Sequence, residues 1–313
     1  MPIPPILPIA PDPSHTPPPV QVAAPAPAHA RPAALVTGAA RRIGRVIALD
    51  LARHGWDVVL HCRGGAAALA DAELAAGDAR ALGGAACRAH VLSADLADEA
   101  ACMALVPAAV AAMGRLDAVV NNASRFDYDS AATFSTAAAD AHWRINTAAP
   151  VLLARALHTH LLARQAATGS APGRWARSGC VINLLDQKLA NPNPDYFSYT
   201  LSKAALAEAT VMLAMALAPQ VRVCAVSPGV TLVSGTMNPT EFNAAHQLTP
   251  LGRSTTPDDI ASAVRFLLES PAITGHTLLV DGGQHLLGQP RDVLFLAQQQ
   301  LAAAAALTPS QST

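Results

Sequence analysis

Residues 34–44 read Ala-Leu-Val-Thr-Gly-Ala-Ala-Arg-Arg-Ile-Gly, and this stretch decides the fold of the chain. A short apolar run ends at Thr37-Gly38, and from Ile43 onward the apolar residues recur at helical spacing, which predicts a strand, a glycine turn and an amphipathic helix. Glycines let a backbone approach a pyrophosphate closely, and a helix N-terminus offers oriented N–H donors. The loop lacks the middle glycine of the usual Gly-x-Gly-x-x-Gly pattern and carries Arg42. An ordinary tight turn is therefore the alternative interpretation.

The alternation of strand and helix continues along the chain. Helical patterns separate short apolar runs that predict strands at 33–37, 57–61, 88–92, 117–121, 180–184, 221–226 and 277–280. This order predicts a single α/β domain with a doubly wound, Rossmann-like parallel sheet and helices on both faces. Ligands bind at the carboxyl ends of the strands in such sheets. We therefore expect the residues that end or follow strands to share one edge; they are Gly38, Arg63, Asp95, Asn121, Asp186 and Ser227.

The two ends of the chain and one internal stretch depart from this pattern. Residues 1–32 are rich in proline and alanine, which predicts a disordered tail before a domain over 33–290. Residues 291–313 form a C-terminal extension, rich in glutamine and alanine, that we expect to fray or to pack on a neighbouring subunit. Residues 230–257 have no clear period, and so long a loop predicts a substrate lid.

Composition excludes several classes of partner. The net charge is −1 and no basic block occurs, so neither nucleic acid nor an anionic membrane is expected as a partner. No apolar run reaches the roughly eighteen residues that a membrane span needs. The five cysteines are odd in number and form no Cys-x-x-Cys, which fits reduced thiols in a cytoplasmic protein. The eleven histidines show no metal-ligand spacing, so no metal is expected.

A second motif carries the chemistry. Tyr199 and Lys203 are four residues apart in a stretch that predicts a helix, so they share one helix face. A neighbouring ammonium lowers the pKa of a phenol, which would make Tyr199 a usable general acid. Asp186, at the end of a predicted strand, can join the pair. Taken alone, such a pair is a weak signal, because most Tyr-x-x-x-Lys pairs are two surface neighbours.

Together these motifs resemble the short-chain dehydrogenase/reductase family. The resemblance covers about residues 33–285, and six motifs occur in the order of that family: Thr37-Gly38 through Gly44, Asp95-Leu96, Asn121-Asn122-Ala123, Asn146, Tyr199 with Lys203, and Pro228-Gly229. Most members carry serine where this chain has Asp186. A subset similar to pteridine reductases carries aspartate there, an arginine-rich first loop and an aromatic residue at the position of Phe126.

The resemblance to that subset implies reduction of a C=N bond in a pterin, dihydropterin or dihydrofolate by NADPH. The chemistry of Asp186 favours the same substrate, because a carboxyl can bond an amidine-like N–H pair or pass a proton to a ring nitrogen. Ketones present no such nitrogen. In that subset the aromatic residue stacks on the pterin, which is the role implied for Phe126; a position in the hydrophobic core is the alternative. The alternative for Asp186 is a carboxylate that only accepts bonds from surface loop donors.

The choice of cofactor is predicted after the second strand. An enzyme for NAD presents an acidic side chain there to the ribose 2′-hydroxyl, whereas this chain has Arg63 followed by two glycines. Arg63 can pair with a 2′-phosphate, and Arg41 and Arg42 add positive charge nearby. We therefore expect NADPH, the alternative being that these arginines are solvated surface groups.

Residue roles follow from the resemblance. The implied catalytic residues are Asp186, Tyr199, Lys203 and Asn146, of which Asn146 would hold a water that relays protons to Lys203 or serve as a structural amide. The implied substrate residues are Arg42, Ser124, Phe126, Asp186 and Tyr199. The implied cofactor residues are Gly38, Arg41, Arg42, Ile43, Gly44, His61, Arg63, Asp95, Leu96, Asn121, Ala123, Ser124, Tyr199, Lys203, Pro228 and Gly229.

Two rival functions remain open from the sequence. One is a carbonyl or 3-oxoacyl-thioester reductase of the same family, which Asp186 disfavours. The other is a non-catalytic NADP(H)-sensing binding protein, which the intact pair of Tyr199 and Lys203 disfavours. In each case we expect a homo-oligomer, a tetramer or a dimer.

Overall fold

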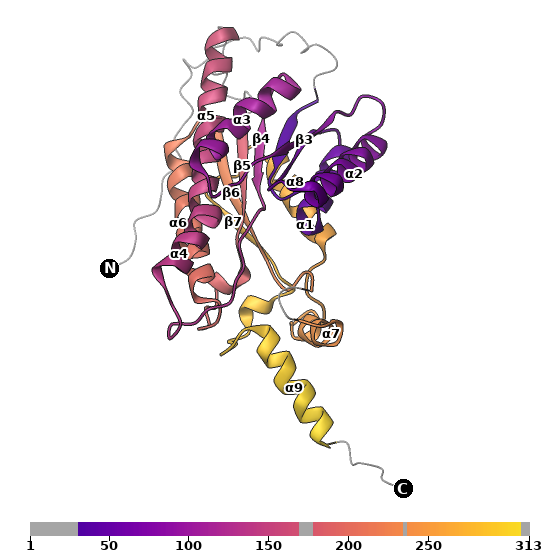
Figure 1. The fold of residues 1–313 in the computed structure, drawn as a ribbon, viewed down its shortest axis with the longest axis vertical. Coiled ribbons are helices and arrows are strands. Elements are labelled where there is room, and N and C mark those ends of the chain that lie inside the picture. Colours follow the sequence, from indigo (N-terminus) through magenta and orange to yellow (C-terminus); the bar gives the residue numbers. More distant parts are fainter. Residues whose placement is uncertain (1–30, 169–177, 234–236, 308–313) are drawn as a thin grey trace, which may run out of the picture. The chain divides into compact units, whose positions relative to one another are not determined.

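A computed structural model describes residues 31–168, 178–233 and 237–307 (Figure 1). Its centre is a seven-stranded parallel sheet in the order β3-β2-β1-β4-β5-β6-β7. This confirms the predicted doubly wound sheet, and every predicted strand lies within two residues of an observed one. The strands are β1 Ala33–Val36, β2 Asp57–Cys62, β3 Ala89–Ser93, β4 Ala118–Asn121, β5 Gly179–Leu184, β6 Val221–Pro228 and β7 Thr277–Val280.

Helices cover both faces of the sheet (Figure 1). One layer consists of α1 Arg42–Arg53, α2 Ala66–Gly83 and α8 Pro257–Glu269, and the other of α3 Glu99–Met113, α4 Thr136–Trp143, α5 Ala149–Thr168 and α6 Phe197–Ala216. Successive side chains of a strand point to opposite faces. In β1, Ala34 and Val36 therefore belong to the core under the first layer, and Ala33 and Leu35 to the core under the second. The five inner strands are buried almost throughout, which explains their continuous apolar runs, whereas the edge strands β3 and β7 are partly exposed.

The strand order reverses between β1 and β4, which both pair with their neighbours in parallel. Chain leaving β1 continues to one side of the sheet and chain leaving β4 to the other, so the loops separate and open a crevice at the carboxyl edge. That edge carries the functional residues described below.

The predicted structureless stretch 230–257 contains a helix, α7 Pro239–Gln247. Asn238 accepts from the backbone N–H groups of Thr240 and Glu241, and Glu241 returns a bond to the Asn238 N–H, which is a capping box. The helix is too short to show a clear apolar period. The Asn-Pro-Thr-Glu signal at its start is the feature that could have identified it in the sequence.

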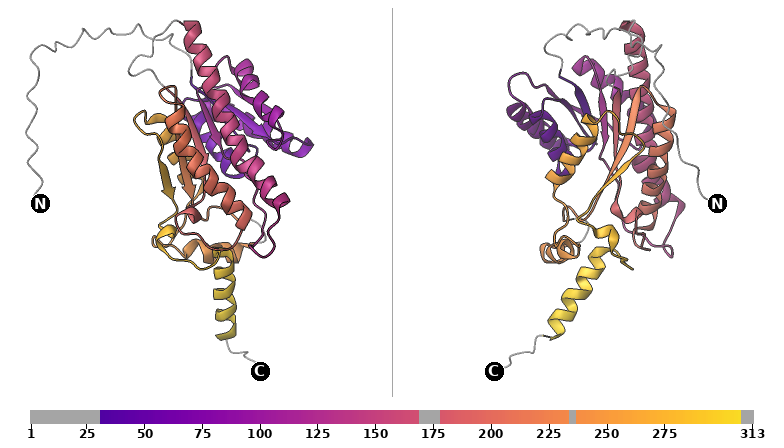
Figure 2. Two further views of the ribbon diagram at one scale, coloured as in Figure 1. Left: turned by 90° about the vertical axis from the view of Figure 1, so that its left-hand side faces the viewer. Right: turned by 180° about the vertical axis from the view of Figure 1, so that it is seen from behind.

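The C-terminal extension is also helical, as α9 Val293–Leu307. Val293, Leu294 and Ala297 are buried in a small apolar cluster with Met237 and Ala245. The extension thus packs on α7 of its own chain, beyond the carboxyl ends of the strands (Figure 2).

The ordered domain begins two residues earlier than expected. Arg31 donates to the carbonyl oxygens of Ala52 (2.7 Å), Trp56 (2.9 Å) and Gly83 (3.1 Å), and the Asp57 N–H donates to the Pro32 carbonyl (2.8 Å). Arg31 and Pro32 are therefore part of the domain and not of the tail. The rest of the predicted tail lies outside the described residues. None of the described helices is long and apolar enough to cross a membrane.

Candidate active site

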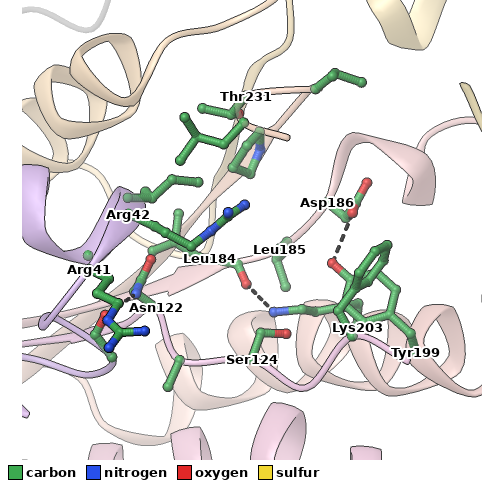
Figure 3. Close-up of a pocket in the computed structure, with 18 of the residues that line it drawn as sticks. Arg41, Arg42, Asn122, Ser124, Leu184, Leu185, Asp186, Tyr199, Lys203 and Thr231 are labelled. Carbon is green, nitrogen blue, oxygen red and sulfur yellow. Dashed lines mark hydrogen bonds between the residues drawn. The ribbon is translucent and has the colours of Figure 1, made fainter. Parts of the chain in front are cut away.

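One cleft of about 830 Å³ lies at the carboxyl edge of the sheet (Figure 3). Loops that follow five strands line it, and so does the segment that leads into α9. Of the predicted site residues, those lining it are Gly38, Arg41, Arg42, Ile43, Gly44, Arg63, Ala123, Ser124, Phe126, Asp186, Tyr199, Lys203, Pro228 and Gly229. The fold thus gathers most of the predicted site into one cavity.

The loop after β1 is closed by a backbone contact that only glycine permits. A Cβ at Gly44 would lie 2.4 Å from the Gly38 carbonyl oxygen and 2.4 Å from Asn122 Nδ2, and Gly38 itself has φ +64°. Asn122 holds the turn by donating to the Thr37 carbonyl at 2.9 Å. No side chain caps the start of α1. Because its first N–H groups are left to the cleft, this loop fits a pyrophosphate better than it fits an idle turn.

The loop after β2 is a second place for an anion. Arg63 is exposed, and no ion pair is found for it among the described residues. Gly64 and Gly65 follow with positive φ, and α2 then begins with no acidic residue in its first turn and no side-chain cap. Arg41 is paired with Asp71 of α2, and Arg42 donates to the Val233 carbonyl at 2.9 Å. Arg63 is therefore the arginine best placed for a ribose phosphate.

His61 does not line the cleft, contrary to the sequence expectation. Its buried ring accepts from the Gly38 N–H through Nδ1 (3.2 Å), and Nε2 lies 3.0 Å from the Ala94 carbonyl. Burial lowers the pKa of His61, so the ring is neutral and Nε2 carries the proton. His61 supports the glycine loop from behind, because its side chain points into the protein from the end of β2.

Asp95, Leu96 and Asn121 are also outside the lining of the cleft. Asp95 holds a turn by accepting from the Ala97 N–H at 3.0 Å, and Leu96 is buried in the core. Asn121 points inward from the last position of β4, where its Nδ2 donates to Asn183 Oδ1 at 2.8 Å. The next residue faces the other way, so Asn122 lines the cleft in its place.

Asp186, Tyr199 and Lys203 form a buried group of titratable side chains between the end of β5 and the start of α6. Tyr199 and Lys203 lie one helical turn apart and are 6% and 3% exposed, which rules out two solvated surface neighbours. Tyr199 Oη donates to Asp186 Oδ2 at 2.9 Å, and Asp186 Oδ1 accepts from the Lys188 backbone N–H at 2.9 Å. Lys203 Nζ donates to the Leu184 carbonyl at 2.7 Å (Figure 3).

Electrostatics in this group differ from the sequence expectation. Burial raises the pKa of Tyr199 well above its ordinary value, and the facing Asp186 carboxylate raises it further. Burial also raises the pKa of Asp186 and lowers the pKa of Lys203 to about 8. The Lys203 ammonium is directed to the Leu184 carbonyl and lies 5.8 Å from the centre of the Tyr199 ring, whereas the phenol itself faces the Asp186 carboxyl, so the net shift of the phenol pKa is upward. Tyr199 therefore keeps its proton at neutral pH and is poised to donate it.

The contacts of Asn146 are those of a structural amide. It lies in a π-helical turn, accepts from the Arg125 N–H at 2.7 Å, and donates to the Arg125 carbonyl (3.0 Å) and to Ser202 Oγ (2.9 Å). Ser202 in turn donates to the Tyr199 carbonyl at 2.6 Å. Asn146 thereby ties the loop after β4 to the first turns of α6, and a proton-relaying water at Asn146 stays a prediction.

Phe126 lines the cleft but is not isolated there. Its ring stacks on Tyr196, with centroids 4.2 Å apart and planes at 15°, and meets the Tyr199 ring edge-on at 4.7 Å. Tyr196 is buried in a left-handed conformation with φ +52° just before α6. One face of Phe126 is thus covered by protein, so a planar substrate would stack on the opposite face.

Sequence reasoning missed an ionic cluster at the same end of the cleft. Arg291 makes a forked pair with Asp195, at 2.8 and 2.9 Å, and Lys188 Nζ donates to the Asp195 carbonyl at 2.6 Å. Lys188 and Asp292 line the cleft. Lys203 lines it as well, so both lysines of the chain lie at this site. Asp195 and Arg291 are too far apart in sequence for any local pattern to join them.

Solved structures resemble this fold and this chain. A FolM alternative dihydrofolate reductase 1 from Brucella suis, in complex with NADP, is 38% identical and superposes with a TM-score of 0.74. The match covers 84% of this chain and 98% of that one.

Curated relatives represent both of the enzymatic interpretations. Pteridine reductase 1 of Leishmania tarentolae is 32% identical over 288 residues, covering 80% of this chain and 96% of the relative. A 3-oxoacyl-[acyl-carrier-protein] reductase of Synechocystis is 32% identical over 255 residues, covering 80% and 95%.

A family model described as Enoyl-(Acyl carrier protein) reductase matches residues 38–285, which span the first glycine loop, the group of Asp186, Tyr199 and Lys203, and β7. With this match and the fold, the chain belongs to the short-chain dehydrogenase/reductase family of oxidoreductases.

Proposed function

We propose that this protein reduces a C=N bond of an oxidised pterin, dihydropterin or dihydrofolate with NADPH. The observation that carries the proposal is the 2.9 Å bond between Tyr199 Oη and the Asp186 carboxyl inside the cleft. An alternative dihydrofolate reductase and a pteridine reductase among the similar proteins support the same substrate class.

The residues present fit the cofactor. The loop from Gly38 to Gly44 offers backbone N–H groups to a pyrophosphate, and Arg63 with the start of α2 suits a 2′-phosphate, which favours NADPH over NADH. Lys203 is placed for ribose hydroxyls beside Tyr199. NADPH supplies the hydride. The chain's own residues supply the proton, orient the ring and exclude water.

Proton delivery follows from the geometry. As hydride reaches the carbon of the C=N bond, the nitrogen needs a proton to balance the pair of electrons it gains. Tyr199 Oη carries that proton, and the Asp186 carboxyl shares it through the 2.9 Å bond. The raised pKa of both groups keeps the proton on the pair until the substrate nitrogen takes it. Asp186 has two oxygens, so it can bond Tyr199 and a ring N–H together, which serine cannot do.

The test is NADPH oxidation with dihydrobiopterin, dihydrofolate and a 3-oxoacyl thioester, measured for the parent, Asp186→Ser and Tyr199→Phe. We expect Asp186→Ser to lose about 10²–10⁴ in pterin turnover and to keep or gain carbonyl reduction. Tyr199→Phe should lose both activities. NADPH binding, followed by cofactor fluorescence, should be unchanged in Asp186→Ser.

Each rival has its own outcome. Pterin reduction by Asp186→Ser at the parent rate would make Asp186 a bystander and favour the carbonyl reductase. Tight NADPH binding without turnover of any substrate would favour a cofactor-sensing protein.

A further inference from the structure

A second carboxylate faces the cleft from a part of the chain that the family motifs do not include. Asp292 lies directly before α9 and lines the same cavity as Asp186, Tyr199 and Phe126. Its side chain is 20% exposed. Burial is the main cause of the raised pKa of Tyr199, but the Asp292 carboxylate contributes to it, so the two groups are within electrostatic reach.

The backbone of Asp292 is fixed. Its N–H donates to Asp195 Oδ2 at 2.8 Å, next to the forked pair of Asp195 with Arg291. Burial opposes ionisation of Asp195, but the bonds from Arg291 and from the Asp292 N–H keep the pKa of Asp195 below its ordinary value. The fork therefore stays charged at neutral pH. It anchors the entrance of α9 against the turn before α6.

The two carboxylates are engaged to different degrees. Both oxygens of Asp186 accept bonds at 2.9 Å, from Tyr199 and from the Lys188 backbone. In Asp292, Oδ1 accepts from the Leu294 N–H at 3.1 Å, whereas Oδ2 has Lys188 Nζ at 3.5 Å. Lys188 makes its short bond elsewhere, to the Asp195 carbonyl at 2.6 Å. Of the four carboxylate oxygens of Asp186 and Asp292, Asp292 Oδ2 therefore has the most distant hydrogen-bond partner.

We infer that Asp292 is a specificity-determining residue that accepts the N–H donors of the 2-amino-pyrimidinone edge of the substrate. This inference rests on the proposed function and deepens it. Asp186 and Tyr199 together donate the proton, and Asp292 accepts hydrogen bonds from the amine of the substrate. A carboxylate matches an adjacent pair of N–H donors with two parallel bonds. Lys188 Nζ, at 3.5 Å, orients the Asp292 carboxylate when no such donor is near.

The alternative is that Asp292 only caps α9 and balances Lys188. The two roles differ in what they affect. A structural role changes stability and every substrate alike, whereas a recognition role changes the KM of those substrates that carry the amine.

The experiment compares a dihydropterin with its 2-oxo analogue, in which oxygen replaces the exocyclic amine, for the parent and Asp292→Asn. The parent should prefer the amine. In Asp292→Asn the KM for the dihydropterin should rise about ten- to one-hundredfold, because a charge-assisted bond is lost, while kcat changes little. The 2-oxo analogue should be affected less, since an asparagine amide can donate to its oxygen. The Kd of biopterin for enzyme saturated with NADP⁺, measured by pterin fluorescence, should rise with the KM.

Two variants serve as controls. Arg31→Ala removes bonds to three carbonyl oxygens outside the cleft, so it should lower Tm and affect both substrates by the same factor. Asp258→Asn removes an exposed carboxylate of α8 outside the cleft and should change neither Tm nor the KM for either substrate.

The outcomes separate the inference from the proposed function. If the parent reduces dihydropterin and Asp292→Asn retains the parent preference for the amine, Asp292 has no role in recognition. A uniform loss on both substrates with a lower Tm, like that expected for Arg31→Ala, would also overturn the inference. A parent enzyme that neither binds nor reduces pterins would overturn the proposed function, and this inference with it.

Discussion

The two halves of the cleft are built in opposite ways. The half formed by the loops after β1 and β2 consists of glycines, uncapped helix starts and exposed arginines, so its binding groups are mainly backbone N–H donors. The half formed by the end of β5, the start of α6 and the entrance of α9 consists of buried titratable side chains bonded to one another. The first half depends on where the backbone can go, and the second on which side chains keep or give up protons.

This difference predicts how each half responds to substitution. A backbone site is sensitive to added atoms at its glycines and tolerates many changes of side chain elsewhere. A site of buried ionisable groups responds to pH and to loss of charge. Four experiments test this contrast, and they are given in order of decreasing expected effect.

The largest effect concerns Lys203 in the buried half. Its pKa is lowered from 10.5 to about 8 by burial, so its ionisation in the folded protein carries a cost. That cost is present in full below about pH 8 and disappears as the unfolded chain also loses its proton near 10.5. The unfolding free energy of the parent should therefore rise relative to Lys203→Met between these pH values, by on the order of 3 kcal/mol. Urea denaturation over this range measures it, and a difference independent of pH would contradict the assignment.

The next effect tests the backbone half. Gly44→Ala places a Cβ against the Gly38 carbonyl and Asn122, and the resulting overpacking should destabilise the protein by about 1–3 kcal/mol and weaken NADPH binding. Gly77→Ala, inside α2 with no atom near the added Cβ, is the matched control. It should be neutral or stabilising by about 0.5–1 kcal/mol, because alanine favours a helix. Thermal melting of both variants is sufficient, and equal Tm values would remove the argument for close approach.

A smaller effect is expected at Arg63. Arg63→Ala should weaken NADPH about tenfold and leave NADH nearly unchanged, because one charge-assisted contact with a phosphate is lost at an exposed site. Arg53→Ala, an exposed arginine at the end of α1 outside the cleft, is the control. The measurement is kcat/KM for both cofactors, and equal values for NADPH and NADH in the parent would show that no 2′-phosphate is recognised.

The smallest effect is expected at the N-terminus. Removal of residues 1–30 should leave activity and Tm nearly unchanged, because a proline-rich segment lacks the N–H groups for helix or sheet pairing. The same truncation with Arg31→Ala should lower Tm, since Arg31 bonds three carbonyl oxygens of the domain. A fall of several degrees with residues 1–30 alone removed would mean that the tail docks.

Local sequence patterns were sufficient to predict the sheet and the backbone half of the cleft. Strand burial on both faces, the turn at Gly38 and Gly44, and the turn of helix that separates Tyr199 from Lys203 are local patterns, and local patterns fix local geometry. The order of the motifs then placed them at one edge by topology.

Which side chains face the cleft, and how they are ionised, depends on the tertiary structure. Asn121 and His61 lie at the ends of strands whose next residues, Asn122 and Cys62, line the cleft, but their own side chains point inward, because successive side chains of a strand face opposite sides. The raised pKa of Tyr199 depends on burial, and the cluster of Lys188, Asp195 and Asp292 joins segments about a hundred residues apart. Burial and long-range pairing depend on contacts between segments that are far apart in the sequence, and for that reason no local stretch of sequence predicts them.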